Sequence, residues 1–197
     1  MKHILKIRTL SLIGLAVMLL FVLTTVALAQ PVSQAQTNGD NLVKTVRLVT
    51  QRAPVTAAEA NGHGRFLGCV SGPEGSMGVH YPNPTLVGDG ILDANRPEVL
   101  VYEPKNGKLE LAAVEYLVLY DDWHANNDGP PVLAGQVFNY VGSPNRYGMP
   151  AFYELHVWAW KDNPNGVFAD WNPNVSCETY AGESVFVNAQ KKGLVPR

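Results

Sequence analysis

The sequence predicts an α+β protein in which an N-terminal helical segment packs on an antiparallel β-sheet or a small β-barrel. Two observations support this fold class. Apolar residues recur at helical spacing between residues 41 and 52. After Cys69, Gly, Pro and Asn separate short runs rich in Val, Tyr, Phe and Leu, which is typical of strands joined by turns. Residues 41–190 are expected to form a single globular domain, which is long enough to bury a core.

The two ends of the chain are expected to lie outside this domain. Residues 1–29 resemble a signal peptide, because three basic residues precede an uncharged apolar run that ends in Ala27-Leu28-Ala29. We therefore expect a secreted or extracytoplasmic protein. An uncleaved leader, long enough to cross a bilayer, is the alternative and would be its only membrane contact. Residues 191–197 are expected to be a disordered tail, in which "LVPR" resembles a protease recognition sequence left by an expression vector.

The helical segment is expected in two pieces. Residues 30–40 are polar and lack aromatic side chains, so a flexible lead-in is expected there. Asp40 is then expected to cap a helix that begins at Asn41. A second, shorter helix should follow Pro54 and stop at Gly62.

Strands are expected over residues 98–104, 107–120, 134–142, 151–160 and 184–189. Lys105–Gly107 is expected to form a hairpin turn between the first two of them. The segment "MGVHYPNP" (77–84) ends in a proline-rich turn and is expected to be an edge strand or a strand end.

The chain has two cysteines, Cys69 and Cys177. In an exported protein a disulfide between them is expected. Closing a loop of about 100 residues would stabilise the fold by roughly 4–5 kcal/mol in the chain-entropy model. A metal site at either cysteine is disfavoured, because neither has a CxxC or CxxH neighbour.

The charge and the motifs disfavour several classes of function. The net charge is −2 and no basic run follows the leader, which disfavours nucleic-acid binding. No GxSxG elbow, P-loop or dinucleotide fingerprint is present.

Strand alternation indicates one carboxylate in an apolar row. In the 107–120 strand, Glu115 shares a face with Leu109, Leu111, Ala113, Leu117 and Leu119. A buried carboxylate must be paired, hydrogen-bonded, protonated or bound to a metal. In the 151–160 strand, Glu154 and His156 share a face with Phe152, Trp158 and Trp160. A row of apolar side chains that includes a few polar ones is typical of the wall of a ligand pocket.

Two of the histidines stand in apolar surroundings. His80 and His156 have aromatic and apolar neighbours, whereas His63 and His124 lie in polar loops. Two imidazoles and a carboxylate suit a divalent zinc, copper, iron or manganese ion, so His80, His156 and Glu115 form the candidate ligand set. His124 or Glu154 could add a fourth ligand or support the others. The alternative is that each strand histidine is a hydrogen-bonded core residue.

Several motifs resemble an uncharacterised family of exported bacterial proteins. "SMGVHYPNP", "RPEVLVYEP", "VEYLVLY" and "HVWAWKDNPNGVFADWNP" are similar to its MGxHY, PExLxYEP, VEY and HVWxWxxNPxGxFxxWNP elements. The resemblance covers nearly all of residues 55–177 and implies no known reaction. It implies that His80, Glu103, Glu115 and His156 lie in signature elements, whereas His124 lies outside them.

Three hypotheses for the function follow. The first is a secreted metal-binding protein that could be a metalloenzyme, with its site in an aromatic-lined pocket to which Tyr81, Glu103, Trp158 and Trp160 contribute. The second is a non-catalytic module that binds a glycan or a small apolar molecule. The third is a metal-free enzyme in which Glu115 or Glu154 is the catalytic base. The sequence leaves open whether the protein is an enzyme.

Overall fold

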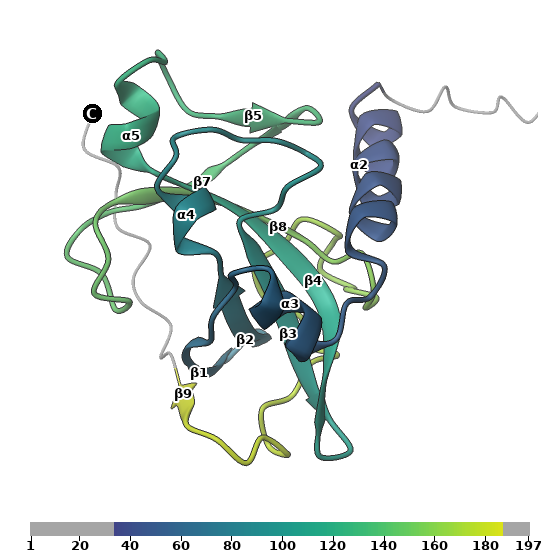
Figure 1. Cartoon of the computed structure of the whole chain (residues 1–197). Coiled ribbons are helices and arrows are strands. Elements are labelled where there is room, and N and C mark those ends of the chain that lie inside the picture. The colour runs from purple at the N-terminus through teal and green to yellow at the C-terminus, as the bar shows by residue number, and fades with distance from the viewer. Residues whose placement is uncertain (1–33, 187–197) are drawn as a thin grey trace, which may run out of the picture. The chain divides into compact units, whose positions relative to one another are not determined.

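The computed structural model describes residues 34–186 (Figure 1). The expected signal peptide and the tail with its "LVPR" sequence lie outside the described residues. Within residues 34–186, no helix has the length and hydropathy needed to cross a membrane.

A curled sheet of seven strands is the centre of the fold (Figure 1). Its spatial order is β7-β8-β4-β3-β2-β1-β9, and every neighbouring pair is antiparallel except β1 and β9. The expected antiparallel sheet is therefore confirmed as the main element, in the form of an open half-barrel. The strands are β1 (Phe66–Gly72), β2 (Gly75–Pro82), β3 (Val99–Lys105), β4 (Lys108–Leu119), β7 (Asn139–Val141), β8 (Phe152–Val157) and β9 (Ser184–Phe186).

Helices and a small hairpin accompany the sheet. The helices are α2 (Gln34–Thr50), α3 (Val55–Ala60), α4 (Pro84–Val87) and α5 (Tyr120–His124), and the hairpin joins β5 (Val132–Leu133) to β6 (Gln136–Val137). Leu42 and Val46 of α2 are buried in the same core cluster as residues of the sheet. The mixed α+β class is thus observed.

The first helix is longer than the sequence predicted. It begins at Gln34, so Asp40 lies inside the helix and is not its N-cap, and residues 34–40 of the expected lead-in are helical. Gly39 is buried, and a Cβ added to it would lie 3.0 Å from the ring of Phe168. The helix backbone at Gly39 thus packs closely against Phe168, at a point before the apolar periodic part of the helix. The second helix agrees with the prediction and is followed by Gly62 at φ +89°.

Several strands differ from the prediction. β2 lies between β1 and β3, so "MGVHYPNP" is not an edge strand, but it does contain the end of β2 at Pro82, which was the alternative expected. The 134–142 run is divided into two short strands, and the 151–160 run leaves the sheet after Val157. β1 was not expected, and its pairing with β2 is interrupted by a register shift between Phe66 and Cys69. The strand predicted over residues 184–189 is present over residues 184–186, and the rest of this range lies outside the described residues.

A β-bulge at Ala112 changes the expected faces of the longest strand. Val101 pairs with Ala113, but its neighbour Tyr102 pairs with Leu111, so Ala112 is the additional residue. Leu111 therefore packs in the same cluster as Val114, on the face opposite to Glu115. Simple alternation placed Leu109 and Leu111 beside Glu115, and that placement was wrong.

The disulfide predicted from the two cysteines is present. Cys69 in β1 is bonded to Cys177, with a Cα–Cα distance of 5.6 Å across a sequence separation of 108 residues. It ties the beginning of the sheet to the loop that precedes β9. A disulfide of this kind fits a protein of an oxidising compartment.

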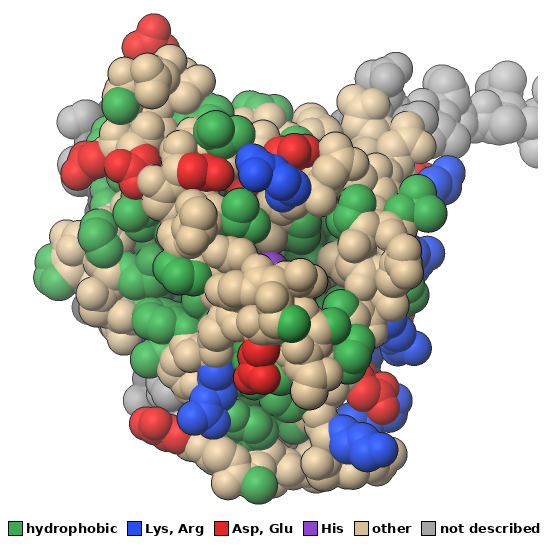
Figure 2. All heavy atoms as spheres, viewed as in Figure 1, with side chains coloured by type: hydrophobic (Ala, Val, Ile, Leu, Met, Phe, Trp, Pro, Cys, Tyr) green, Lys and Arg blue, Asp and Glu red, His purple; other side chains and the backbone are tan. Residues whose placement is uncertain are grey.

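Charged side chains of both signs are spread over the face shown in Figure 2, and some of opposite sign lie side by side. Positive side chains gather along α2 and at the turn between β3 and β4, where Lys44, Arg47 and Lys108 lie. Negative ones gather over α5, which contains Asp121 and Asp122. Neither sign dominates, which agrees with the net charge of −2.

We predict that replacement of Glu98 by Gln makes stability less sensitive to pH. Glu98 is 1 % exposed, and its Oε2 accepts a 3.1 Å hydrogen bond from the Leu117 amide. Burial raises its pKa from 4.5 to about 8. The folded state thus retains a proton that the unfolded state releases, so stability is highest below pH 4.5 and is lost as the pH rises towards 8.

The loss could reach about 1.4 kcal/mol per pH unit within this window. Urea unfolding should therefore show that the free energy of unfolding of Glu98→Gln, relative to that of the wild type, increases as the pH is raised from 5 to 8. Glu74→Gln, at an exposed position, is the control and should follow the wild type. A constant difference between Glu98→Gln and the wild type at every pH would contradict the prediction.

Candidate metal centre

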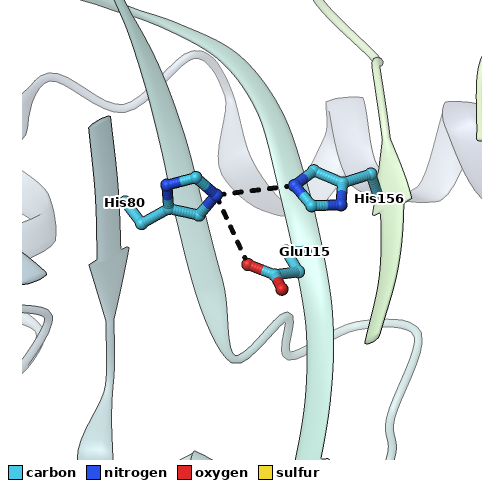
Figure 3. A group of neighbouring side chains, drawn as sticks. All are labelled: His80, Glu115 and His156. Carbon is cyan, nitrogen blue, oxygen red and sulfur yellow. Dashed lines mark hydrogen bonds and ion pairs between the residues drawn. The ribbon is translucent and has the colours of Figure 1, made fainter. Parts of the chain in front are cut away.

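Three strands of the sheet, β2, β4 and β8, place the candidate ligands on one face. His80 lies in β2, Glu115 in β4 and His156 in β8. Glu115 is directly opposite His156, and Val101 of β3 is directly opposite His80. The three polar side chains point toward one another from their strands (Figure 3).

The ligand atoms of these side chains converge. The Nε2 atoms of His80 and His156 are 3.5 Å apart, and the His80 Nε2 is 3.6 Å from the Glu115 Oε2. One ligand atom from each residue lies within 4.8 Å of the other two. The two imidazole rings meet edge to face, with an interplanar angle of 88°. The predicted group of His80, Glu115 and His156 is therefore present, as the one such group among the described residues.

The position of His80 depends on a glycine two residues before it. Gly78 has φ +98°, and a Cβ there would lie 2.6 Å from the Tyr102 carbonyl oxygen. Only glycine allows this close approach of β2 to β3. The His80 side chain is 13 % exposed. Burial and the neighbouring His156 lower its pKa to about 3, against a hydrogen bond to the backbone of Gly78 that raises it. His80 is thus a neutral imidazole at physiological pH.

His156 is enclosed more completely than His80. It is fully buried, and the ring of Trp158 stacks beside it at 6.3 Å between centroids. Trp158 is held in turn by a hydrogen bond that its indole Nε1 donates to the Ala169 carbonyl at 2.6 Å. Trp158 was expected in the pocket wall and lies instead behind His156.

Asp170 stands on the far side of His156 from the ligand group. Its Oδ1 is 3.6 Å from the His156 Nδ1, slightly beyond hydrogen-bond length, and it accepts a 3.0 Å hydrogen bond from the Asn139 amide. Burial opposes the ionisation of Asp170, but the interaction with His156 outweighs burial and its pKa is lowered. The sequence analysis missed Asp170. No local pattern marks it, because it lies in a loop that only the fold brings to β8.

Glu154 forms a carboxyl pair with Glu115. Glu154 is 6 % exposed and Glu115 is 4 % exposed, and a hydrogen bond joins the two side chains. Burial and then the charge of Glu154 raise the pKa of Glu115 well above its usual value. Burial also raises the pKa of Glu154, which the charge of His156 opposes. A hydrogen bond between two carboxyl groups requires a proton on one of them, so this pair holds a proton in the absence of a cation.

Four other candidate residues do not join the group. The His124 Nε2 contacts the Tyr153 hydroxyl at 3.1 Å, and Tyr153 faces the opposite side of the sheet. Glu103 accepts a 2.6 Å hydrogen bond from Lys161.

Tyr81 alternates with His80 and packs against Tyr102 in the opposite core. Trp160 lies beyond the end of β8 and donates a hydrogen bond to Thr50 of α2. Alternation predicted the face of Trp160 incorrectly because the strand ends at Val157, before it.

A pocket of about 220 Å³ opens over the candidate ligands. We call it the apolar pocket. It lies on the sheet face that carries His80, and Val87 of α4 and Met149 of the loop after β7 contribute to its walls. Figure 2 shows hydrophobic side chains gathered on the side of the molecule where α4 and this loop lie. Its lining is Phe66, Leu67, Val70, Met77, His80, Pro82, Pro84, Val87, Val99, Glu115, Leu117, Tyr147, Met149, Phe152 and Glu154.

Comparison with known proteins adds no assignment. No family model, no curated protein and no solved structure matches this chain.

We predict that His80 stays unprotonated in the folded, metal-free protein at pH 5. Its lowered pKa results from burial next to His156, so its ring resonances should not shift between pH 8 and pH 5. Proton–carbon NMR of the histidine Hε1 resonances, assigned with a His80→Gln variant, measures this. The same residue in urea-unfolded protein is the control and should titrate near pH 6.5. A midpoint near this value in the folded protein would contradict the prediction.

Proposed function

We propose that this protein binds one divalent transition-metal ion through His80, Glu115 and His156. The observation that carries the proposal is the convergence of two buried imidazole nitrogens and a carboxylate oxygen from three different strands. Chance burial rarely brings such groups to one point, because each polar group removed from water must find a partner.

The separations between the donor atoms suit an ion placed among them. Two nitrogen ligands about 2.1 Å from a tetrahedral zinc ion lie about 3.4 Å apart. The observed separations are 3.5 Å between the imidazole nitrogens and 3.6 Å between His80 and Glu115. All three ligand atoms lie within 4.8 Å of one another, so the ion would draw the more distant donors closer on binding. The donor set of two imidazoles and a carboxylate suits zinc, copper, iron or manganese.

The electrostatics of the group also support a cation. Both histidines present Nε2 to the same point, and the neutral imidazole of His80 has a free lone pair for a metal. Glu115 holds its proton because burial and then the charge of Glu154 raise its pKa, and a bound ion would replace this proton. Asp170 behind His156 matches the carboxylate that commonly orients a metal-binding histidine.

Three protein ligands leave a coordination position open. Structural zinc sites are usually closed by four protein ligands, whereas catalytic sites keep a position for water or substrate. Here the open position would face the apolar pocket, because His80 and Glu115 line it. We therefore favour a metalloenzyme in which the ion polarises an oxygen or activates a water. The predicted leader and the disulfide support action outside the cytoplasm.

A second candidate is a metal-free acid–base enzyme. The hydrogen-bonded pair of Glu115 and Glu154 favours it, because two carboxyl groups with raised pKa values can exchange a proton with a substrate. His80 would then be a neutral hydrogen-bonding neighbour. Measuring the metal content of the purified protein distinguishes the two candidates, because only the first requires a bound ion.

We predict one tightly bound ion per chain in protein purified without chelator and measured by mass spectrometry of the elements. His156→Ala should remove it, because it deletes one of three ligands. His124→Ala is the matched control and should retain the ion, because His124 contacts Tyr153 and not the ligand group. Binding should weaken as the pH is lowered, because protons compete with the ion for Glu115, whose pKa is raised by burial. A protein that holds no ion after purification, and takes up none of the four metals, would overturn the proposal.

We further predict that Asp170→Asn weakens metal binding by about 10- to 100-fold, because an amide cannot stabilise the metal-bound imidazole as a carboxylate does. Competition with a chromophoric chelator measures the affinity. Asp162→Asn, an exposed change in the same loop, is the control and should have no effect. Equal affinities of wild type and Asp170→Asn would show that Asp170 does not support the site.

A further inference from the structure

The apolar pocket differs in chemistry between its walls and its inner end. The walls include Met77, Val99 and Phe152, none of which can form a strong hydrogen bond. The hydroxyl of Tyr147 is already engaged, since it accepts a 2.7 Å hydrogen bond from Arg146 and donates one to the Met77 Sδ at 3.9 Å. The polar side chains that remain to a ligand are the candidate ligands His80 and Glu115 and their neighbour Glu154.

The size of the pocket limits what can enter it. A cavity of about 150 Å³ lined by apolar side chains accepts a benzene molecule. The apolar pocket measures about 220 Å³. By proportion it would enclose a body of about nine non-hydrogen atoms.

We propose that the apolar pocket binds a compact apolar molecule of about nine non-hydrogen atoms that carries one oxygen group, with this oxygen facing His80 and Glu154. An aryl- or alkyl-substituted alcohol, aldehyde or acid has this form. The direction of the oxygen rests on the proposed function, because there it would occupy the open position of the ion. Binding of the apolar part of the molecule in the pocket does not depend on the ion.

The same walls argue against a glycan. A sugar carries a hydroxyl group on nearly every carbon, and each hydroxyl that enters the pocket would lose its hydrogen bonds to water. Side chains such as Val70, Leu117 and Phe152 cannot replace these bonds. Of the two ligand classes expected for a binding module, the pocket walls thus favour a small apolar molecule over a glycan.

Methionine methyl NMR tests the inference at the pocket itself. Met77 and Met149 both line the pocket, and an aromatic ligand shifts nearby methyl resonances. Metal-free protein with carbon-13-labelled methionine methyls is titrated with 2-phenylethanol, ethylbenzene and glucose. We expect saturable shifts of both methyls with 2-phenylethanol and roughly tenfold weaker binding of ethylbenzene, which lacks the hydrogen-bonding oxygen. Glucose should cause no shift.

Two variants that fill the pocket provide the controls. Val87→Trp from α4 should abolish the shift of the Met77 methyl, and Met149→Trp from the loop should do the same if the first variant does not fold. Val132→Trp, at an exposed position of β5, should bind 2-phenylethanol like the wild type. Absence of a saturable shift with 2-phenylethanol, or an equal response to glucose, would overturn the inference.

Repeating the titration with the metal-loaded protein separates the two proposals. A preference for 2-phenylethanol over ethylbenzene that is larger with the ion than without it would support the stated direction of the oxygen. If 2-phenylethanol binds but no metal does, the proposed function fails and the enclosure of the apolar body stands. If the metal binds and 2-phenylethanol does not, the pocket inference fails and the proposed function stands.

Discussion

The candidate site depends on the curl of the sheet from β2 to β8. Two strands, β3 and β4, lie between them. At a spacing of about 4.8 Å, three strand-to-strand steps would place β2 and β8 roughly 14 Å apart in a flat sheet. Upright side chains on such a sheet could not meet. The observed separation of 3.5 Å between the imidazole nitrogens therefore requires a concave face that brings His80 and His156 together.

The bulge at Ala112 contributes to this curvature. Bulges bend a strand and increase its local twist. This one lies where β3 pairs with β4, next to Val101, which is the cross-strand neighbour of His80. The same bulge directs Leu111 to the opposite core, so Leu111 does not pack beside Glu115.

The ionisable groups around this face divide into two sets. Asp170 behaves as an ionised partner of His156, with a lowered pKa. Glu115 and Glu154 share a proton because burial disfavours two charges so close together. The result is a cluster rich in acidic groups that avoids charge by retaining protons. Such a cluster is matched to a cation, since one divalent ion would satisfy the groups that now hold protons or face one another.

The sequence predicted the residues of the candidate site better than their surroundings. His80, Glu115 and His156 could be chosen because each is a polar residue within an apolar strand, and alternation assigned Glu154 and His156 to one face correctly. Alternation failed at Leu111 because a bulge leaves no mark in a pattern of period two. It also failed at Trp160, beyond the end of the strand.

The remaining error concerned residues that only tertiary contacts bring into place. Asp170 reaches His156 from a loop fourteen positions farther along the chain, with no spacing rule to predict it. The first turns of α2 were missed for a similar reason. Their packing against Phe168 is a contact between the two ends of the domain, and the local composition of residues 34–40 indicates only a polar segment.

His80 and His156 differ in their access to solvent. This difference determines the route by which a metal ion would reach the proposed site. His156 is fully buried between Trp158 and Asp170, whereas His80 and Glu115 line the apolar pocket. An ion would therefore enter and leave through the pocket. A ligand that fills a volume of about 220 Å³ would close this route. A bound ligand would therefore slow both the entry and the release of the ion. The pocket would then serve both as the binding site of the ligand and as an entrance to the metal.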